Sequence, residues 1–384
     1  NGDGIPLQLE GEEKSASTAS SVLRIEKEKE DFCFINVPSR PVPSFLRNFS
    51  APIKLVYEYS DDDLAFLLAH DDDPFNQWEA GQRLATKSMM DAIENHQGDE
   101  KISVSPDLIE AIRKVLENDL LDPAIKAEIL LLPSEGVLSE LQETIDVEIT
   151  HSVRESTIRQ IAEGLRDELL EIYQQTSSCE PYQFNPEAVG KRSLKNICLS
   201  LLMRLNDESI FEICSRQIEK AGNMTDVISA LAQITNADTP DKQRLLIAFY
   251  EKWKHEKLVI DKWLSIQACS SLPGTLDSVK RLLEHESFDI RNPNKVRALI
   301  GGFCMGNPIN FHAADGSGYK FLADQVIKLD SANPQIAARL LNGLIRWKRY
   351  DLNRQKIMKS QLDWVLQTPK LSPGCYEIAT KGLA

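Results

Sequence analysis

The sequence has no apolar run that approaches the ~20 residues of a membrane-spanning helix, although 42% of its 384 residues are hydrophobic. Its first residues, Asn1-Gly-Asp-Gly, lack the basic and apolar start of a secretory signal. The seven cysteines are odd in number, scattered, and form no C-x-x-C pair, which argues against a disulfide framework and a zinc knuckle. We therefore expect reduced cysteines, a cytoplasmic or other intracellular location, and no membrane partner.

Positive charge is scarce relative to negative charge. The 44 lysines and arginines against 58 aspartates and glutamates give a net charge of −14. Proteins that bind nucleic acids carry clustered basic residues, because these neutralise the phosphates. We therefore expect no nucleic-acid partner.

Motifs that carry chemistry are missing as well. The motif H-E-x-x-H places two histidines one helical turn apart on a zinc ion, with the glutamate beside the bound water. His255-Glu256 lacks a histidine at position 259, and His285-Glu286 lacks one at position 289. There is also no Gly-x-Ser-x-Gly elbow, no Walker-type loop and no G-x-G-x-x-G. The sequence therefore predicts no catalytic residue, metal ligand or cofactor in this chain.

Helix start signals, in contrast, are abundant. Nine of the 18 prolines directly follow a residue that caps helices well, and apolar residues at spacings of three and four come after most of them. These pairs are Asp73-Pro74, Ser105-Pro106, Asp122-Pro123, Asn185-Pro186, Thr239-Pro240, Asn292-Pro293, Asn307-Pro308, Asn333-Pro334 and Ser372-Pro373. Short connections make consecutive helices antiparallel. The pattern predicts a mainly α fold, an irregular α-solenoid of antiparallel helix pairs with no fixed repeat length.

Before residue 60 the apolar period changes to two. Three short segments, 22–25, 32–35 and 53–59, alternate apolar and polar residues as strands do. Three antiparallel strands with one apolar face are not stable without a second layer. We therefore expect these strands to belong to a larger β structure.

The segment 291–319 is dense in residues that are neither typical core nor typical surface. Asn292 before Pro293 predicts a capped helix start. Apolar residues at 296, 299, 300 and 303 then share one helix face, and Arg297 lies beside that face. The glycines of 315–318 predict a structured turn before the next helix.

The segment from Asn292 to Tyr319, together with Asn223-Met-Thr-Asp226 and Leu258-Val-Ile-Asp-Lys-Trp263, resembles the C-terminal helical domain of bacterial-type alanyl aminopeptidases, the aminopeptidase N family of zinc gluzincins. The resemblance extends from about Val37 to Ala384. It implies that a zinc-binding catalytic domain lies N-terminal to this chain, so that the chain is part of a metallopeptidase but inactive alone. The implied partners are that catalytic domain and peptide substrates.

The resemblance also implies a division of the chain. Residues 1–59 would be the last strands of a small β-sandwich domain, and residues 60–384 an all-helical superhelical domain that closes over the active site and restricts access to it. Arg297 and Arg339 would face the interior cavity and bind substrate. Cys304-Met305 departs from the small residues usual in the family at that point, which would alter the cavity wall locally.

Other interpretations remain open from the residues alone. Arg297 could tie down helix C-termini or pair with a nearby aspartate, and Arg339 could form a buried pair between its small neighbours. His312 is more typical of a structural histidine with satisfied hydrogen bonds than of a proton donor in catalysis. The whole chain could also be an autonomous α-solenoid that binds partner proteins on its concave face.

Overall fold

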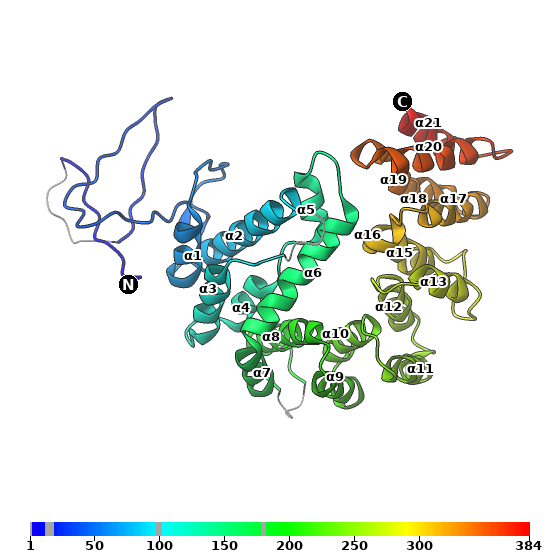
Figure 1. Cartoon of the computed structure of the whole chain (residues 1–384), viewed down its shortest axis with the longest axis horizontal. Helices are drawn as coiled ribbons and strands as arrows, with labels where there is room; N and C mark the ends of the chain where they lie inside the picture. The colour runs from blue at the N-terminus through cyan, green and yellow to red at the C-terminus, as the bar shows by residue number, and fades with distance from the viewer. Residues whose placement is uncertain (1, 12–18, 97–101, 178–181) are drawn as a thin grey trace. The chain divides into compact units, whose positions relative to one another are not determined.

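The structure is a computed structural model, and it describes residues 2–11, 19–96, 102–177 and 182–384. The chain divides into two compact units. The smaller unit contains the residues up to Ala85 and the segment Ser105–Leu121, and the larger contains Thr86–Val104 and Asp122–Ala384. Helices make up most of the larger unit, whereas the described residues before Ser60 in the smaller unit are largely irregular (Figure 1). The predicted fold class, mainly α, is confirmed.

Among its described residues, the smaller unit contains a 3₁₀ turn, Arg47–Phe49, and three α-helices, the second of which continues into the larger unit. They are α1 (Asp61–His70), α2 (Pro74–Glu94) and α3 (Pro106–Glu117). Ser60 caps α1 in a reciprocal capping box with Asp63, and α1 packs on α3 through buried leucines. The three aspartates of the first turn of α1 suit the positive end of the helix dipole.

The three predicted strands do not pair with one another in the part of the chain that the structure describes. A single antiparallel bridge joins Leu9 to Phe34, with hydrogen bonds of 2.9 Å on either side. Apolar side chains of the predicted strands are exposed, with Val22 at 82%, Ile25 at 69% and Ile53 at 57%. Their alternation was detectable in the sequence, but a sheet forms only where a second layer covers its apolar face.

The larger unit is a succession of helices that pack mainly on their neighbours along the chain. Its first half contains α4 (Pro123–Leu130), α5 (Glu135–Leu141), α6 (Val147–Gly164), α7 (Arg166–Gln175), α8 (Pro186–Leu202), α9 (Glu208–Lys220), α10 (Met224–Thr235) and α11 (Asp241–Trp253). Its second half contains α12 (Lys257–Ala268), α13 (Thr275–Leu283), α14 (Pro293–Val296), α15 (Gly302–Gly306), α16 (Pro308–Phe311), α17 (Ser317–Asp330), α18 (Pro334–Leu340), α19 (Asn342–Ile345), α20 (Leu352–Leu366) and α21 (Pro373–Leu383). Within this unit the path of helices curves, so that α16 packs against α6 (Figure 1).

The predicted helix starts are largely confirmed. At each capping pair except Thr239-Pro240 a helix begins at the proline, and at Thr239-Pro240 it begins one residue later, at Asp241. The capping side chain accepts a hydrogen bond from the first turn in these helices, as Asn292 does from Asn294 N at 3.0 Å. Proline is favoured there because its missing N–H would have no partner in the first turn.

A buried polar cluster holds α8, α9 and α10 together. Asp226, in the first turn of α10, forms an ion pair with Lys195 and accepts a hydrogen bond from Asn196 Nδ2 at 2.9 Å. Gln217 of α9 donates to Asn196 Oδ1 at 2.8 Å and to Asp226 O at 3.0 Å. Asn223 caps α10 by accepting a hydrogen bond from Asp226 N at 2.9 Å, so the segment Asn223-Met-Thr-Asp226 starts a helix and has a structural role. No helix of the described residues is long and apolar enough to cross a membrane.

Candidate functional site

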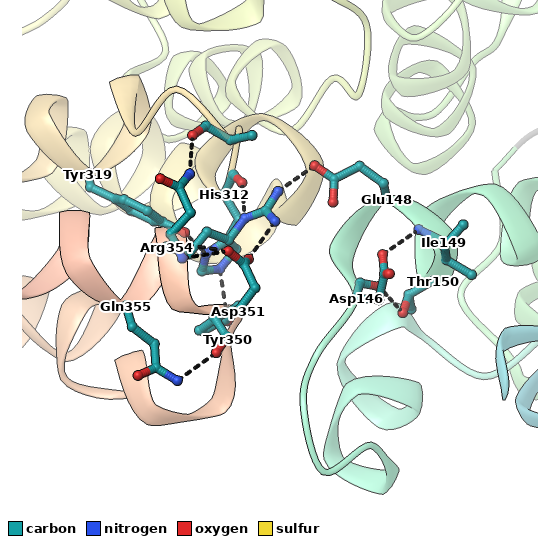
Figure 2. A network of polar contacts seen from close by, with 12 residues as sticks. Asp146, Glu148, Ile149, Thr150, His312, Tyr319, Tyr350, Asp351, Arg354 and Gln355 are labelled. Atoms are coloured by element: carbon teal, nitrogen blue, oxygen red, sulfur yellow. Dashed lines mark hydrogen bonds and ion pairs between the residues drawn. The ribbon is translucent and has the colours of Figure 1, made fainter. Parts of the chain in front are cut away.

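The most distinctive site in the larger unit is the contact between its early and late helices, here called the seam. It joins residues 139–150, at the end of α5 and the start of α6, to residues 346–354, which include the 3₁₀ turn Trp347–Arg349 and the start of α20. The residues in contact are more than 200 positions apart in the sequence, and Figure 2 shows part of the network that joins them.

The late side of the seam is built around His312. Its Nδ1 lies 2.9 Å from the Tyr319 hydroxyl and its Nε2 lies 3.0 Å from the Tyr350 hydroxyl, so both ring nitrogens have partners. The ring also stacks on Tyr350, with 4.4 Å between the centroids. Burial and the positive charge of Arg354 lower the pKa of His312 to about 3, so the ring is neutral at neutral pH. These contacts match the structural interpretation of His312.

The turn before Tyr319 explains how His312 reaches this position. A Cβ at position 318 would lie 2.1 Å from the carbonyl oxygen of Phe311, so only glycine lets the two segments of the main chain approach this closely. Phe311 is buried and packs edge-on against Tyr319, with ring centroids 5.4 Å apart. The close passage of α17 over α16 thus brings the tyrosine hydroxyl to the histidine.

Arg354 connects this block to the early helices. Its Nε donates to the carbonyl oxygen of His312 at 2.7 Å, and one terminal nitrogen pairs with Asp351 at 2.8 Å. Its other terminal nitrogen pairs with Glu148 of α6, across the seam (Figure 2). Asp351 also caps α20, with hydrogen bonds of 2.9 and 3.1 Å from the amides of Asn353 and Arg354.

The early side of the seam has its own network. Gln142 donates to Thr150 Oγ1 at 2.8 Å and accepts from the amide of Asp146 at 2.9 Å. Asp146 caps α6 by accepting from Ile149 N at 3.0 Å. The side chains of Gln142, Asp146 and Thr150 are therefore held by partners within this turn and the start of α6.

Two arginines complete the links across the seam. Arg346 pairs with Glu140 at 2.5 Å, and this hydrogen bond and charge lower the pKa of the Glu140 carboxyl. Arg349 donates to the carbonyl oxygens of Ser139 at 2.9 Å and Gln142 at 2.6 Å. The amide of Ile145 donates to Arg349 O at 2.7 Å, a main-chain hydrogen bond between the two sides.

A pocket of about 280 Å³ lies at the seam. Its wall comes from both sides, with Glu135, Glu140 and Thr150 from the early helices and His312, Arg346 and Tyr350 from the late ones. Cys304 and Met305 also line it. The lining combines apolar surface with one cationic and two anionic side chains.

The two arginines predicted to bind substrate lie outside this pocket lining. Arg297 opens a π-helical segment, Arg297–Gly301, and its exposed side chain donates to the carbonyl oxygen of Pro293 at 3.2 Å and to the side chain of Asn294. Arg339 is exposed on α18. No hydrogen bond or ion pair between described residues joins these two side chains to each other.

Apart from His312, the residues that build the seam were not singled out in the sequence. Glu148 and Arg354 resemble the other charged residues of their helices, and the i,i+3 spacing of Asp351 and Arg354 is a signal that could have found the local pair but not the contact with Glu148. Among residues 2–11, 19–96, 102–177 and 182–384, no group of three or more His, Cys, Asp or Glu side chains could hold a metal ion.

Comparison with known proteins adds family relationships to this geometry. Residues 61–384 match a family model described as a domain of unknown function with ARM repeats (DUF3458_C), and residues 4–58 match one described as a domain of unknown function with an Ig-like fold (DUF3458). The first model agrees with the irregular succession of helices in the larger unit.

Curated relatives match along the whole chain. The chain is 40% identical to aminopeptidase N of Escherichia coli and 35% identical to aminopeptidase N of Haemophilus influenzae, in each case over 383 residues, or 100% of this chain. It spans 43% of the length of each of these relatives.

A solved structure shows the same fold. It is a crystal structure of Legionella pneumophila aminopeptidase A in complex with aspartic acid, with a TM-score of 0.80 and 33% identity over 91% of this chain and 41% of that one. The chain belongs to the DUF3458_C family and corresponds to the C-terminal part of bacterial aminopeptidase N, its Ig-like and helical ARM-repeat domains.

Proposed function

We propose that the chain is the non-catalytic C-terminal part of a zinc aminopeptidase that removes N-terminal residues from peptides, and that it covers the active site and restricts which substrates enter. The observation that carries the proposal is the 40% identity to an aminopeptidase N over the full chain, which spans 43% of that relative. The catalytic domain of the same protein and peptide substrates are the proposed partners. The matched ranges 4–58 and 61–384 support a division into two domains at residues 59 and 60.

The zinc ion of such an enzyme does not fit the described residues of this chain, because they offer no cluster of metal-binding side chains. A catalytic zinc site needs three protein ligands with an open position for water. We therefore assign the metal, and every step that depends on it, to the remainder of the longer protein. The buried thiols of Cys198, Cys214 and Cys304 support our proposal of an intracellular location.

Arg297 and Arg339 are the residues we propose to contact the peptide beyond the cleaved bond. Both side chains are exposed on the larger unit. Local hydrogen bonds to Pro293 and Asn294 use two of the five N–H donors of Arg297 and leave the others for a ligand. A π-helical turn such as Arg297–Gly301 is frequent at functional sites. Guanidinium groups match peptide carboxylates in a bidentate geometry.

The experiment replaces each arginine by alanine in the intact enzyme. A charged hydrogen bond of about 1.5–3 kcal/mol predicts a fall in kcat/KM of roughly 10- to 100-fold for a peptide of several residues. An aminoacyl amide, which does not reach these arginines, should be hydrolysed at nearly the original rate. Arg291→Ala is the matched control, because Arg291 is exposed and pairs with its near neighbour Asp289. Equal losses on both substrates would instead indicate a structural role.

The restriction of access can be tested separately. The zinc domain would be assayed with and without this chain, on an aminoacyl amide and on a folded protein with a free N-terminus. We expect the chain to raise amide turnover and to suppress attack on the folded protein. If it changes neither, the proposal fails, and the alternative of an autonomous α-solenoid that binds partner proteins becomes the better explanation.

A further inference from the structure

We propose that the seam is a latch, meaning a closure held by charged side chains that opens while the helices on both sides stay folded. Three features of residues 139–150 and 346–354 support the latch: the hydrogen bonds within each side, the exposure of the ion pairs between the sides, and the packing between the sides.

Each side of the seam has hydrogen bonds of its own that do not depend on the other side. On the early side, Gln142, Asp146 and Thr150 bond to one another and cap α6. On the late side, Arg354 keeps Asp351 and the carbonyl oxygen of His312 as partners even without Glu148 (Figure 2). Separation of the two sides would therefore leave neither with an unpaired buried charge, which is the main cost of breaking a buried network.

The ion pairs across the seam are partly open to water. The side chains of Glu140 and Arg346 are 57% and 52% exposed, and Glu148 is 51% exposed, although its partner Arg354 is 9% exposed. Exposed ion pairs add little to stability, because water competes for both charges and salt screens them. The remaining links are the packing of α16 on α6 and the hydrogen bonds of Arg349 and its carbonyl to the main chain of residues 139–145, whose groups water can satisfy when the seam opens.

Packing at the seam is incomplete. The pocket of about 280 Å³ lies between the two sides, whereas consecutive helices elsewhere in the unit bury leucine, isoleucine and valine against each other. A space of this size removes the dispersion contacts that a close-packed interface would have. Segments with few buried apolar contacts and exposed hydrogen bonds are the ones that open locally in native proteins.

The consequence for the protein is a second state of the larger unit in which α5 and the start of α6 part from α20. In that state the pocket lining and the carbonyl groups of residues 139–142 become accessible. Only this last step rests on the proposed function: in an enzyme that acts on peptides, an opening seam would widen the way for an extended chain.

Amide hydrogen exchange tests the latch, with the intact protein and no substrate present. The reporter is the Ile145 amide, whose partner is Arg349 O across the seam. The variant combines Glu140→Gln and Glu148→Gln, which remove both carboxylate charges with little change of shape. We expect the Ile145 amide to exchange on the order of tenfold faster, while amides in the middle of α6 keep their rates. Glu377→Gln, which breaks an exposed pair with Lys381 within α21, is the matched control and should change nothing at Ile145.

Two further measurements remain informative if the variant folds poorly. In the unaltered protein, a rise in ionic strength should speed exchange at Ile145, because screening weakens the exposed pairs. A disulfide between Ile145→Cys and Arg349→Cys should slow exchange at the amide of residue 145 relative to the same variant with the disulfide reduced. Exchange at Ile145 that ignores both salt and the carboxylate changes would overturn the latch, and so would an equal acceleration throughout α6, because α6 would then be unfolding. Neither result depends on peptidase activity, so failure of the latch is distinguishable from failure of the proposed function.

Discussion

The buried ion pair between Lys195 and Asp226 gives the most quantitative prediction. Lys195 is 8% exposed and Asp226 is 3% exposed, and the carboxylate also accepts from Asn196 and Asn223. Asp226→Asn removes the negative charge but preserves the shape of the side chain, so Lys195 remains buried without a counter-charge. Loss of one partner of a buried pair costs about 3–5 kcal/mol.

We expect Asp226→Asn to lower the free energy of unfolding of the larger unit by this amount. At about 2–4 °C per kcal/mol for a large domain, it corresponds to a fall in Tm of roughly 6–20 °C. Denaturation in urea, followed by tryptophan fluorescence, measures it, because the buried Trp263 and Trp347 both lie in this unit. Asp241→Asn is the matched control: its pair with Arg244 is about half exposed, and its loss should cost no more than about 1 kcal/mol.

A companion variant separates charge burial from simple loss of contacts. Addition of Lys195→Met to Asp226→Asn removes the unpaired ammonium while the asparagine oxygen can still accept from Asn196. The double variant should therefore be more stable than Asp226→Asn alone. The reasoning is refuted if Asp226→Asn costs as little as Asp241→Asn, or if the second substitution adds its own loss of stability instead of restoring some.

Two other predictions concern the core under the seam and a titrating histidine. Gly318→Ala should lower the free energy of unfolding, measured in urea, by about 3 kcal/mol or more, because the new Cβ would lie 2.1 Å from Phe311 O. Gly222→Ala is the control and should be nearly neutral, because no atom lies within 4 Å of its Cβ position. Similar losses for both variants would contradict this. The hydrogen bond between His151 and Glu135, at 2.7 Å, raises the pKa of His151 in the folded protein. The protonated His151 therefore stabilises the fold fully below the unfolded pKa of about 6.5, and this stabilisation is lost as pH rises through the higher folded pKa. Glu135→Gln should flatten that pH dependence of unfolding, and a slope that persists would assign it to another group.

The seam gives the helical domain a feature that an open solenoid lacks. In an open array each helix pair contacts only its neighbours, and stability depends on local packing. Here three arginines join the late helices to the early ones: Arg346, Arg349 and Arg354. A shift of the late helices therefore alters contacts of the early helices, about 200 residues away in the sequence. That coupling would let the unit change its opening without unfolding any helix.

The capping pairs predicted the structure correctly, and the alternating segments did not. The capping pairs located helix starts because a cap and its proline act within one turn, and Asn292-Pro293 needs nothing outside residues 292–296 to begin its helix. The alternating segments 22–25 and 53–59 did not form a sheet among the described residues, because strand formation requires partners that alternation alone does not supply.

The sequence by itself determined the helical fold class, most helix starts and the family resemblance. Each of these depends on residues close together in the chain or on the order of short segments along it. Tertiary structure alone decided that Glu148 meets Arg354 and that Ile145 bonds to Arg349, which are about 200 residues apart. Such contacts follow from the summed turns of every intervening helix, and no local pattern encodes that sum.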